Sequence, residues 1–187
     1  MTNFRNHTPI RTCTKEYKNY RKYKPYLAID FKNKCGYTDC SDFWFGGMNT
    51  FHIDHFKPFS KNPILETDYS NLVYCCSYVN ILKSDDEGNY LDPCSVDFNL
   101  HFQRNSDGSI IPVSTSPQAN YMYNKLRLYI SRYSIIWKLD EIFIRLEKLK
   151  EKIRNEKNTL IENDLRILHS KLAEEFTDYL KYLKAVQ

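Results

Sequence analysis

Glycine and long apolar runs are scarce in this sequence, and their scarcity excludes several classes of protein. Only 5 of the 187 residues are Gly, while 15 are Tyr and 11 are Phe, so a largely disordered chain is not expected. No apolar run approaches the roughly 20 residues that a membrane span needs. The first residues, MTNFRNHTPIRTC, contain no apolar segment typical of a secretory signal. We therefore expect a folded cytoplasmic protein with no membrane partner.

Cysteine is present, but its pattern does not favour disulfide bonds. In a chain without a secretory signal, free thiols or metal ligands are more common than cross-links. Adjacent cysteines such as Cys75 and Cys76 cannot easily be joined to each other. The six cysteines are Cys13, Cys35, Cys40, Cys75, Cys76 and Cys94.

Positive charge is concentrated at the N-terminus. Residues 1–34 contain nine Lys or Arg and two acidic residues, a balance of +7, whereas the rest of the chain has 18 basic and 21 acidic residues, a balance of −3. We define these residues as a basic, Tyr-rich N-terminal arm. Its basic residues are typical of contact with a polyanion, or of a solvated surface. Tyrosines recur at every third position from Tyr17 to Tyr26, and we expect them to pack on the following domain rather than to stack on bases.

Residues 35–116 are interpreted as the core of the protein. Gly46 and Gly47 separate two aromatic segments, 43–45 and 51–53, which predicts a β-hairpin. Apolar residues recur at spacings of three and four over residues 71–83, which predicts a helix. A short hairpin is expected around Asp107 and Gly108.

Residues 117–187 are predicted to be helical. Helices are expected at about 118–131, at 134–154, and from Thr159 to about Ala185, with Thr159 and Glu162 forming a capping box. Two of these helices carry apolar stripes joined by a short turn, which predicts an antiparallel helical hairpin. The stripe residues are Leu139, Ile142, Leu146, Leu149 and Ile153 in one helix, and Leu165, Leu168, Leu172, Phe176, Tyr179 and Leu183 in the other. The expected role of the hairpin is packing or partner binding, because it has no catalytic constellation.

Four polar residues in the core provide the groups that phosphodiester hydrolysis requires. A histidine can accept the proton of the attacking water, and His55 supplies it. Mg²⁺ stabilises negative charge and needs only one or two protein oxygen ligands, which Asp54 and Asn80 can supply. Asn71 can orient the histidine or its loop. A structural role for His55 and both asparagines is the simplest alternative.

This pattern resembles the HNH (ββα-metal) nuclease family. The resemblance rests on the residues Asp54-His55, Pro58, Asn71-Leu72, Asn80 and the triplet Lys83-Ser84-Asp85. It implies that His55 is the general base, that Asp54 and Asn80 bind Mg²⁺ or Mn²⁺, and that Asn71 orients the base. The implied fold is α+β, with a small ββα-metal (HNH) core between the N-terminal basic arm and the C-terminal helical hairpin.

Three further residues flank this constellation. His52 shares a strand face with Asp54, and it can contact the metal or a metal ligand, or have a structural role. Lys57 and Lys83 can contact a metal ligand or phosphate, or be solvated surface charges.

The cysteines are an incomplete match to the family. Many HNH proteins hold a structural zinc with two Cys-x-x-Cys pairs. Here the first pair is stretched, to Cys35 and Cys40, and the second is broken because Val79 stands three residues after Cys76. A structural zinc on Cys35, Cys40, Cys76 and a further cysteine, Cys75 or Cys94, remains an alternative to apolar packing.

A narrower resemblance extends over roughly residues 25–150. Asp92-Pro93 and the downstream segment FNLHFQRNSDGSIIP are similar to the HNH subunit of Septu-type anti-phage systems and to retron-associated HNH effectors. This implies a nuclease that acts in an anti-phage defence complex with an ABC-type ATPase. The alternatives are an inactive HNH-fold module that binds nucleic acid or a partner ATPase, and a zinc-stabilised interaction domain. Whether the protein forms oligomers is left open.

Overall fold

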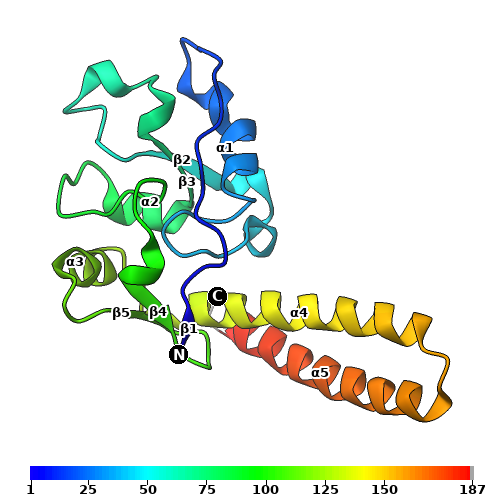
Figure 1. The fold of residues 1–187 in the computed structure, drawn as a ribbon. Coiled ribbons are helices and arrows are strands. Elements are labelled where there is room, and N and C mark those ends of the chain that lie inside the picture. Colours follow the sequence, from blue (N-terminus) through cyan, green and yellow to red (C-terminus); the bar gives the residue numbers. More distant parts are fainter. Residues whose placement is uncertain (186–187) are drawn as a thin grey trace.

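The chain folds as an α+β protein, in which a mixed body carries a projecting helical hairpin (Figure 1). The computed structural model describes residues 1–185. The body contains two small antiparallel sheets. In one, β2 (Phe51–His55) pairs with β3 (Leu72–Cys76), and in the other, β4 (Phe102–Arg104) lies between β1 (Thr2–Asn3) and β5 (Ile110–Pro112). Within the described residues, no helix is both long and apolar enough to cross a membrane.

The sheet that carries the predicted site differs from the predicted hairpin. Residues Asp42–Phe45 form a 3-10 helix, and β2 pairs instead with β3 across the long loop that follows it. The side chain of Ser41 accepts a hydrogen bond from the amide of Phe43 and opens the 3-10 helix, and Gly46, with φ of 101°, closes it. The prediction of a strand over residues 43–45 is therefore wrong.

The helix predicted over residues 71–83 is wrong in its first half. Residues Leu72–Cys76 are β3, and the helix α2 is limited to Ser77–Lys83. All five residues of β3 are buried, so the strand appears in the sequence as a continuous apolar run. Periodicity cannot distinguish a short run of this kind from a buried helical segment. The chain order is consequently strand, long loop, strand, helix.

The N-terminal residues are part of the body. Strand β1 pairs with β4, and the helix α1 (Lys24–Asp30) packs near β3, with Pro25 in its first turn. The tyrosine rings pack on the domain, as expected: Tyr23 is buried with its ring 5.0 Å from that of Tyr69. Residues 1–34 are therefore part of the folded body, with β1 in the β1–β4–β5 sheet and α1 beside the β2–β3 sheet.

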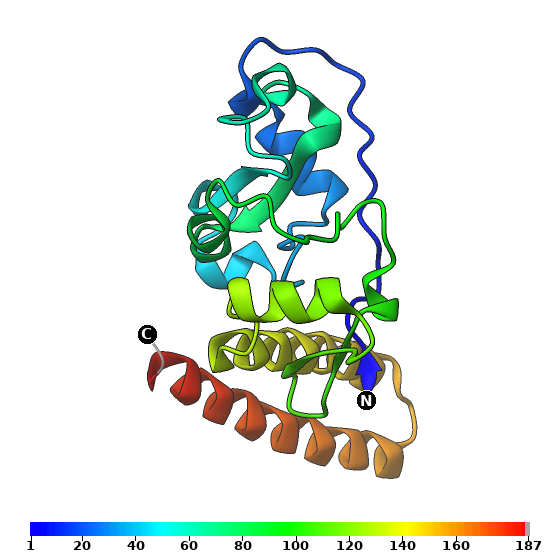
Figure 2. The same cartoon turned by 90° about the vertical axis from the view of Figure 1, so that its left-hand side faces the viewer.

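In Figure 2 the C-terminal helices lie below the part of the body that contains the β2–β3 sheet, with α3 (Pro117–Lys125) uppermost among them. The helices α4 (Ser131–Asn155) and α5 (Thr159–Ala185) pack against each other, which confirms the helical hairpin. The helix predicted over residues 118–131 ends earlier, at Lys125, and the helix predicted over residues 134–154 begins earlier, at Ser131. The side chain of Asn158, rather than Thr159, accepts hydrogen bonds from the amides of Leu160 and Ile161 at the start of α5.

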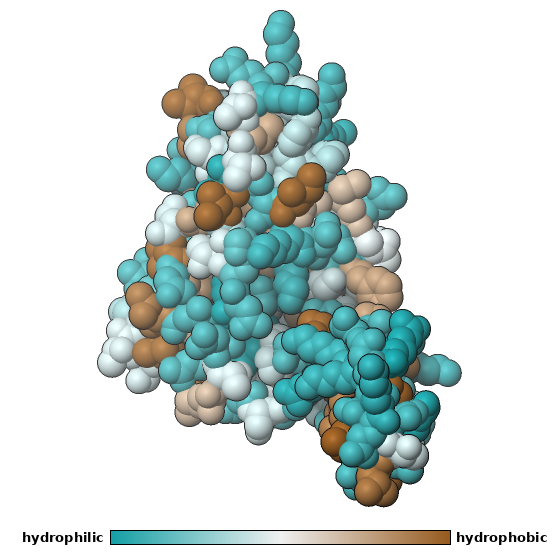
Figure 3. Space-filling model, turned by 45° about the vertical axis from the view of Figure 1, so that its right-hand side comes forward, coloured by the Kyte–Doolittle hydropathy of each residue, from teal (hydrophilic) through white to brown (hydrophobic). Residues whose placement is uncertain are grey.

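The hairpin exposes apolar side chains on its outer surface. Figure 3 shows them as brown patches among hydrophilic residues on the projecting hairpin. The exposed apolar residues of α4 and α5 include Phe143, Ile144, Leu160, Ile161, Ile167, Leu168, Leu180 and Tyr182. Leu168, predicted to lie on the packed stripe of α5, is exposed.

The predicted hairpin around Asp107 and Gly108 is confirmed as the β4–β5 turn. Gly108 has φ of +84°, and a Cβ atom there would lie 2.7 Å from the carbonyl oxygen of Ser134. Gly47 has a similar φ of +82°, but a Cβ atom there would meet nothing within 4 Å among the described residues.

Gly108→Ala is expected to reduce the free energy of unfolding more than Gly47→Ala does. Both variants incur the conformational cost of a positive φ, about 1 kcal/mol or more, but only Gly108→Ala adds a steric clash. Urea denaturation of the two variants measures the difference. Equal losses would show that the backbone of Ser134 yields freely to the added methyl group.

Candidate active site

His55, Asp54 and Asn80 line one cavity of about 320 Å³ at the end of β2. They converge because α2 runs alongside β2: Asn80 contacts His52, and Lys83 contacts Asp54. The pairing of β2 with β3 fixes this arrangement, since α2 follows β3 directly. The other residues that line the cavity are Tyr20, Ile53, Pro58, Phe59, Ser60, Ser84 and Asp85.

The imidazole of His55 is held by two aromatic rings and one carbonyl group. Its ring centroid lies 4.7 Å from that of Tyr20 and 4.8 Å from that of Phe59. Its Nε2 atom lies 2.9 Å from the carbonyl oxygen of Glu66. Because a carbonyl oxygen only accepts hydrogen bonds, Nε2 must be the donor, and in the neutral ring Nδ1 then carries no proton. His55 is therefore held in the tautomer whose Nδ1 can accept a proton.

The carboxylate of Asp54 is buried and accepts two hydrogen bonds. Its Oδ1 accepts from Nζ of Lys83 at 3.1 Å, and its Oδ2 accepts from the hydroxyl of Tyr37 at 2.7 Å. Burial raises the pKa of Asp54, and the Lys83 ammonium and the Tyr37 hydroxyl offset part of this rise. Each carboxylate oxygen has a further lone pair that can contact a metal ion.

Lys83 lies beneath this carboxylate. None of its side chain is exposed, and it also donates a hydrogen bond to the backbone carbonyl of His55 at 2.8 Å. Of the two contacts suggested for it by the sequence, the structure shows the one to a predicted metal ligand, Asp54. The side chain does not reach the surface where phosphate would bind.

Asn71 fastens the loop that links β2 to β3. Its Oδ1 accepts from the amide of Lys57 at 2.8 Å, and its Nδ2 donates to the carbonyl of Lys57 at 2.9 Å and to that of Leu65 at 3.4 Å. Leu65 precedes Glu66, whose carbonyl oxygen contacts His55. Asn71 therefore positions the histidine through the loop and does not contact it directly.

Asn80 is half-buried, and its amide oxygen accepts no hydrogen bond from any described residue. Its Nδ2 lies 3.3 Å from Nδ1 of His52, which is exposed. His52 thus contacts a predicted metal ligand and lies outside the His55 cavity. Lys57 is exposed and its side chain does not line that cavity.

The oxygen donors of the cavity fit a hard divalent cation. Asp54 and Asn80 both line it, and Asp85 adds an exposed carboxylate at its edge. Among residues 1–185, no group of three or more His, Cys, Asp or Glu side chains is placed to hold a metal. Mg²⁺ keeps several water ligands and needs only one or two protein oxygens, which Asp54 and Asn80 can provide.

The cysteines predicted as zinc ligands are buried without forming one cluster of ligands. Burial raises the pKa of the Cys35 thiol, but its interactions with the side chains of Cys76 and Thr38 lower that pKa to about 6. The thiol of Cys40 instead faces two carbonyl oxygens, those of Thr38 at 3.8 Å and Tyr133 at 3.7 Å. Zinc binding stays a prediction.

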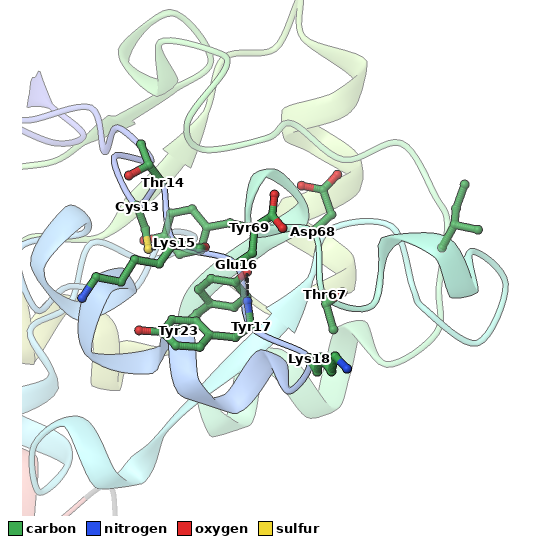
Figure 4. Close-up of a pocket in the computed structure, with 11 residues that line it drawn as sticks. Cys13, Thr14, Lys15, Glu16, Tyr17, Lys18, Tyr23, Thr67, Asp68 and Tyr69 are labelled. Atoms are coloured by element: carbon green, nitrogen blue, oxygen red, sulfur yellow. Dashed lines mark hydrogen bonds between the residues drawn. The ribbon is translucent and has the colours of Figure 1, made fainter.

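A larger cavity, of about 630 Å³, lies between the N-terminal residues and the loop before β3 (Figure 4). The amide of Tyr17 donates to the hydroxyl of Tyr23 within it, at 3.0 Å. Glu16 and Asp68 contribute carboxylates, and no histidine lines it. It therefore has neither a general base of the histidine type nor a uniformly positive lining. Its residues are Cys13, Thr14, Lys15, Glu16, Tyr17, Lys18, Tyr23, Ile64, Thr67, Asp68 and Tyr69.

Two residues of the site were not identified from the sequence. Tyr20 lies against His55, and Tyr37 binds Asp54. Both are distant from their partners in the chain, and both belong to an abundant residue type, so no local pattern distinguishes them.

No protein-family model matches this chain, and neither does any curated protein.

Proposed function

We propose that the protein is a metal-dependent endonuclease that hydrolyses phosphodiester bonds of nucleic acid, with DNA the substrate to be tested first. The observation that carries the proposal is the single cavity lined by His55, Asp54 and Asn80. These side chains are a base and two oxygen donors for a hard cation, the groups that this hydrolysis needs. The resemblance of the sequence to HNH nucleases supports the same assignment.

In the proposed reaction, Nδ1 of His55 takes a proton from the attacking water. The Glu66 carbonyl, which accepts from Nε2, stabilises the imidazolium that results. Asp54 and Asn80 would hold Mg²⁺ or Mn²⁺, which would stabilise negative charge on the phosphate and on the leaving oxygen. Asn71 keeps the loop with Glu66 in place. The products expected from the family are 5′-phosphate and 3′-hydroxyl ends.

A second candidate is an inactive module of the same fold that binds nucleic acid or a protein. The buried contact between Asp54 and Lys83 favours it, because a carboxylate already paired with a lysine and a tyrosine can be purely structural. Such a module would bind without cutting, and its binding would not depend on divalent cations.

The narrower resemblance extends the proposal to a subunit of an anti-phage defence complex with an ABC-type ATPase. The exposed apolar side chains of the α4–α5 hairpin support the presence of a protein partner. Co-expression with a neighbouring ATPase gene, followed by purification through a tag on one chain, tests this. Recovery of the tagged chain alone would contradict it.

Asn80→Ala is expected to raise the Mg²⁺ concentration required for half-maximal cleavage by about tenfold or more, because it removes one oxygen ligand. Asn80 is half-buried, and its loss should leave the fold intact. The measurement is a Mg²⁺ titration of plasmid cleavage. The matched control is Asn163→Ala, at an exposed position of α5. An unchanged Mg²⁺ dependence in Asn80→Ala would remove this residue from the metal site.

A further inference from the structure

A second cavity, of about 340 Å³, adjoins the one that holds His55. The two share Tyr20, Ile53 and Asn80, so they form one continuous depression along the exposed face of β2. The residues that line only the second cavity are Arg21, Lys24, Phe51 and His52. The second cavity therefore continues the His55 cavity along β2.

The charged residues of this second cavity are all basic. Arg21 is exposed and Lys24 is half-buried, and no carboxylate lines the cavity. Within residues 1–185, neither cation forms an ion pair. The ammonium of Lys24 donates only a long hydrogen bond, of 3.3 Å, to the carbonyl of Asn49. Two cations without carboxylate partners in one depression are suited to bind an anion.

The backbone around these cations is fixed by local structure. Residues Tyr20–Tyr23 form a 3-10 helix, which Asn19 caps by accepting from the amide of Arg21 at 3.0 Å. The buried ring of Tyr23 anchors the end of this segment. Tyr20, the residue before Arg21, contacts the ring of His55 directly. The backbone that carries the two cations is therefore fixed relative to His55.

We propose that Arg21 and Lys24 bind a backbone phosphate of the nucleic-acid strand, next to the phosphate that is cut. This inference rests on the proposed nuclease function and names the substrate contact that the site uses. The guanidinium of Arg21 can form bidentate hydrogen bonds with two oxygens of a phosphate, while the ammonium of Lys24 contributes a point charge. The contact is to the backbone, so it positions the strand and carries no sequence preference.

The other basic residues of the segment are less suited to this role. Lys15 and Lys18 line the larger cavity of Figure 4, where their charges are accompanied by Glu16 and Asp68. The ammonium of Lys15 is also engaged with the hydroxyl of Tyr26 at 2.8 Å. Lys15 and Lys18 therefore provide a matched control that removes the same charge from the same segment.

The experiment measures the affinity of a fluorescent DNA oligonucleotide by anisotropy in Mg²⁺, over a range of salt concentrations. All proteins carry His55→Ala, so that the probe is not cut. Adding Arg21→Ala and Lys24→Ala is expected to weaken binding about tenfold or more. It is also expected to reduce the slope of log K against log salt by about 1, because one phosphate contact is lost. Adding Lys15→Ala and Lys18→Ala is expected to change affinity less than about threefold.

Equal weakening by the two pairs would overturn the proposal, because it would show that only net charge matters. Unchanged binding in the Arg21 and Lys24 pair would also overturn it. Thermal unfolding of each protein excludes a loss of fold as the cause.

Cleavage by proteins with His55 intact separates this inference from the nuclease assignment. If wild type cuts and the Arg21 and Lys24 pair has an unchanged KM, the phosphate site is wrong and the nuclease stands. If wild type cuts neither alone nor with the co-purified ATPase, but binding is weakened only by the Arg21→Ala and Lys24→Ala substitutions, the phosphate site stands and the nuclease assignment fails.

Discussion

Replacing His55 with alanine is expected to lower the rate of plasmid cleavage in Mg²⁺ by about 10²–10⁴-fold, the usual contribution of a general base. Among the described residues, only Nε2 of His55 forms a hydrogen bond, so Nδ1 is left to accept a proton. The initial rate of conversion of supercoiled to nicked and linear plasmid measures the effect. Unchanged near-UV circular dichroism would show that the protein stays folded.

The matched control for this variant is His169→Ala, on α5, which removes an imidazole that lines neither cavity along β2. It is expected to cut at the wild-type rate. Equal rates for wild type and His55→Ala would refute the assignment of the base. If neither cuts, the assay is repeated with the co-purified ATPase, and a continued lack of cutting would favour the inactive module.

Replacing Lys83 with alanine is expected to reduce the free energy of unfolding by about 3–5 kcal/mol. The substitution leaves the buried Asp54 carboxylate without its cation and the backbone carbonyl of His55 without its donor. Denaturant unfolding at neutral pH measures the loss. A protein of this size has a total stability of only about 5–15 kcal/mol, so the variant should be close to unfolding.

Lys57→Ala provides the comparison, because it removes the same charge from an exposed position. Its effect is expected to be within about 0.5 kcal/mol. If Lys83→Ala lowers the free energy of unfolding no more than Lys57→Ala does, the buried ion pair with Asp54 contributes little to stability. That result would contradict the role inferred from the contacts of Lys83.

Sequence patterns predicted the parts of the fold that depend on local information. One apolar stripe ends at Ile153 on α4, and the other begins at Leu165 on α5. Both are long enough for the helical period to be unambiguous, and the two helices pack as expected. The Asp107-Gly108 pair marks the β4–β5 turn through the backbone freedom of glycine. The resemblance to the HNH family led us to expect that His55, Asp54 and Asn80 lie together, and all three line one cavity. Their catalytic and metal-binding roles stay a prediction.

Elements defined by long-range pairing could not be predicted in the same way. Strand β3 is buried on both faces, so its residues show no alternation of apolar and polar side chains. Its pairing with β2 spans a long loop, and no local pattern in the sequence indicates it. Residues 43–45 have the composition of a strand but are held in a 3-10 helix by Ser41 and Gly46. In both places, capping and tertiary pairing override the propensity of the residues.

The most direct test of a metal-dependent phosphodiesterase is the analysis of product ends after cleavage of a labelled DNA duplex by the wild-type protein. The structure places one histidine and two oxygen donors in one cavity. We therefore predict 5′-phosphate and 3′-hydroxyl ends in Mg²⁺, and no cleavage when the metal is removed with EDTA. Cleavage that persists in EDTA, or products with 3′-phosphate ends, would contradict the account.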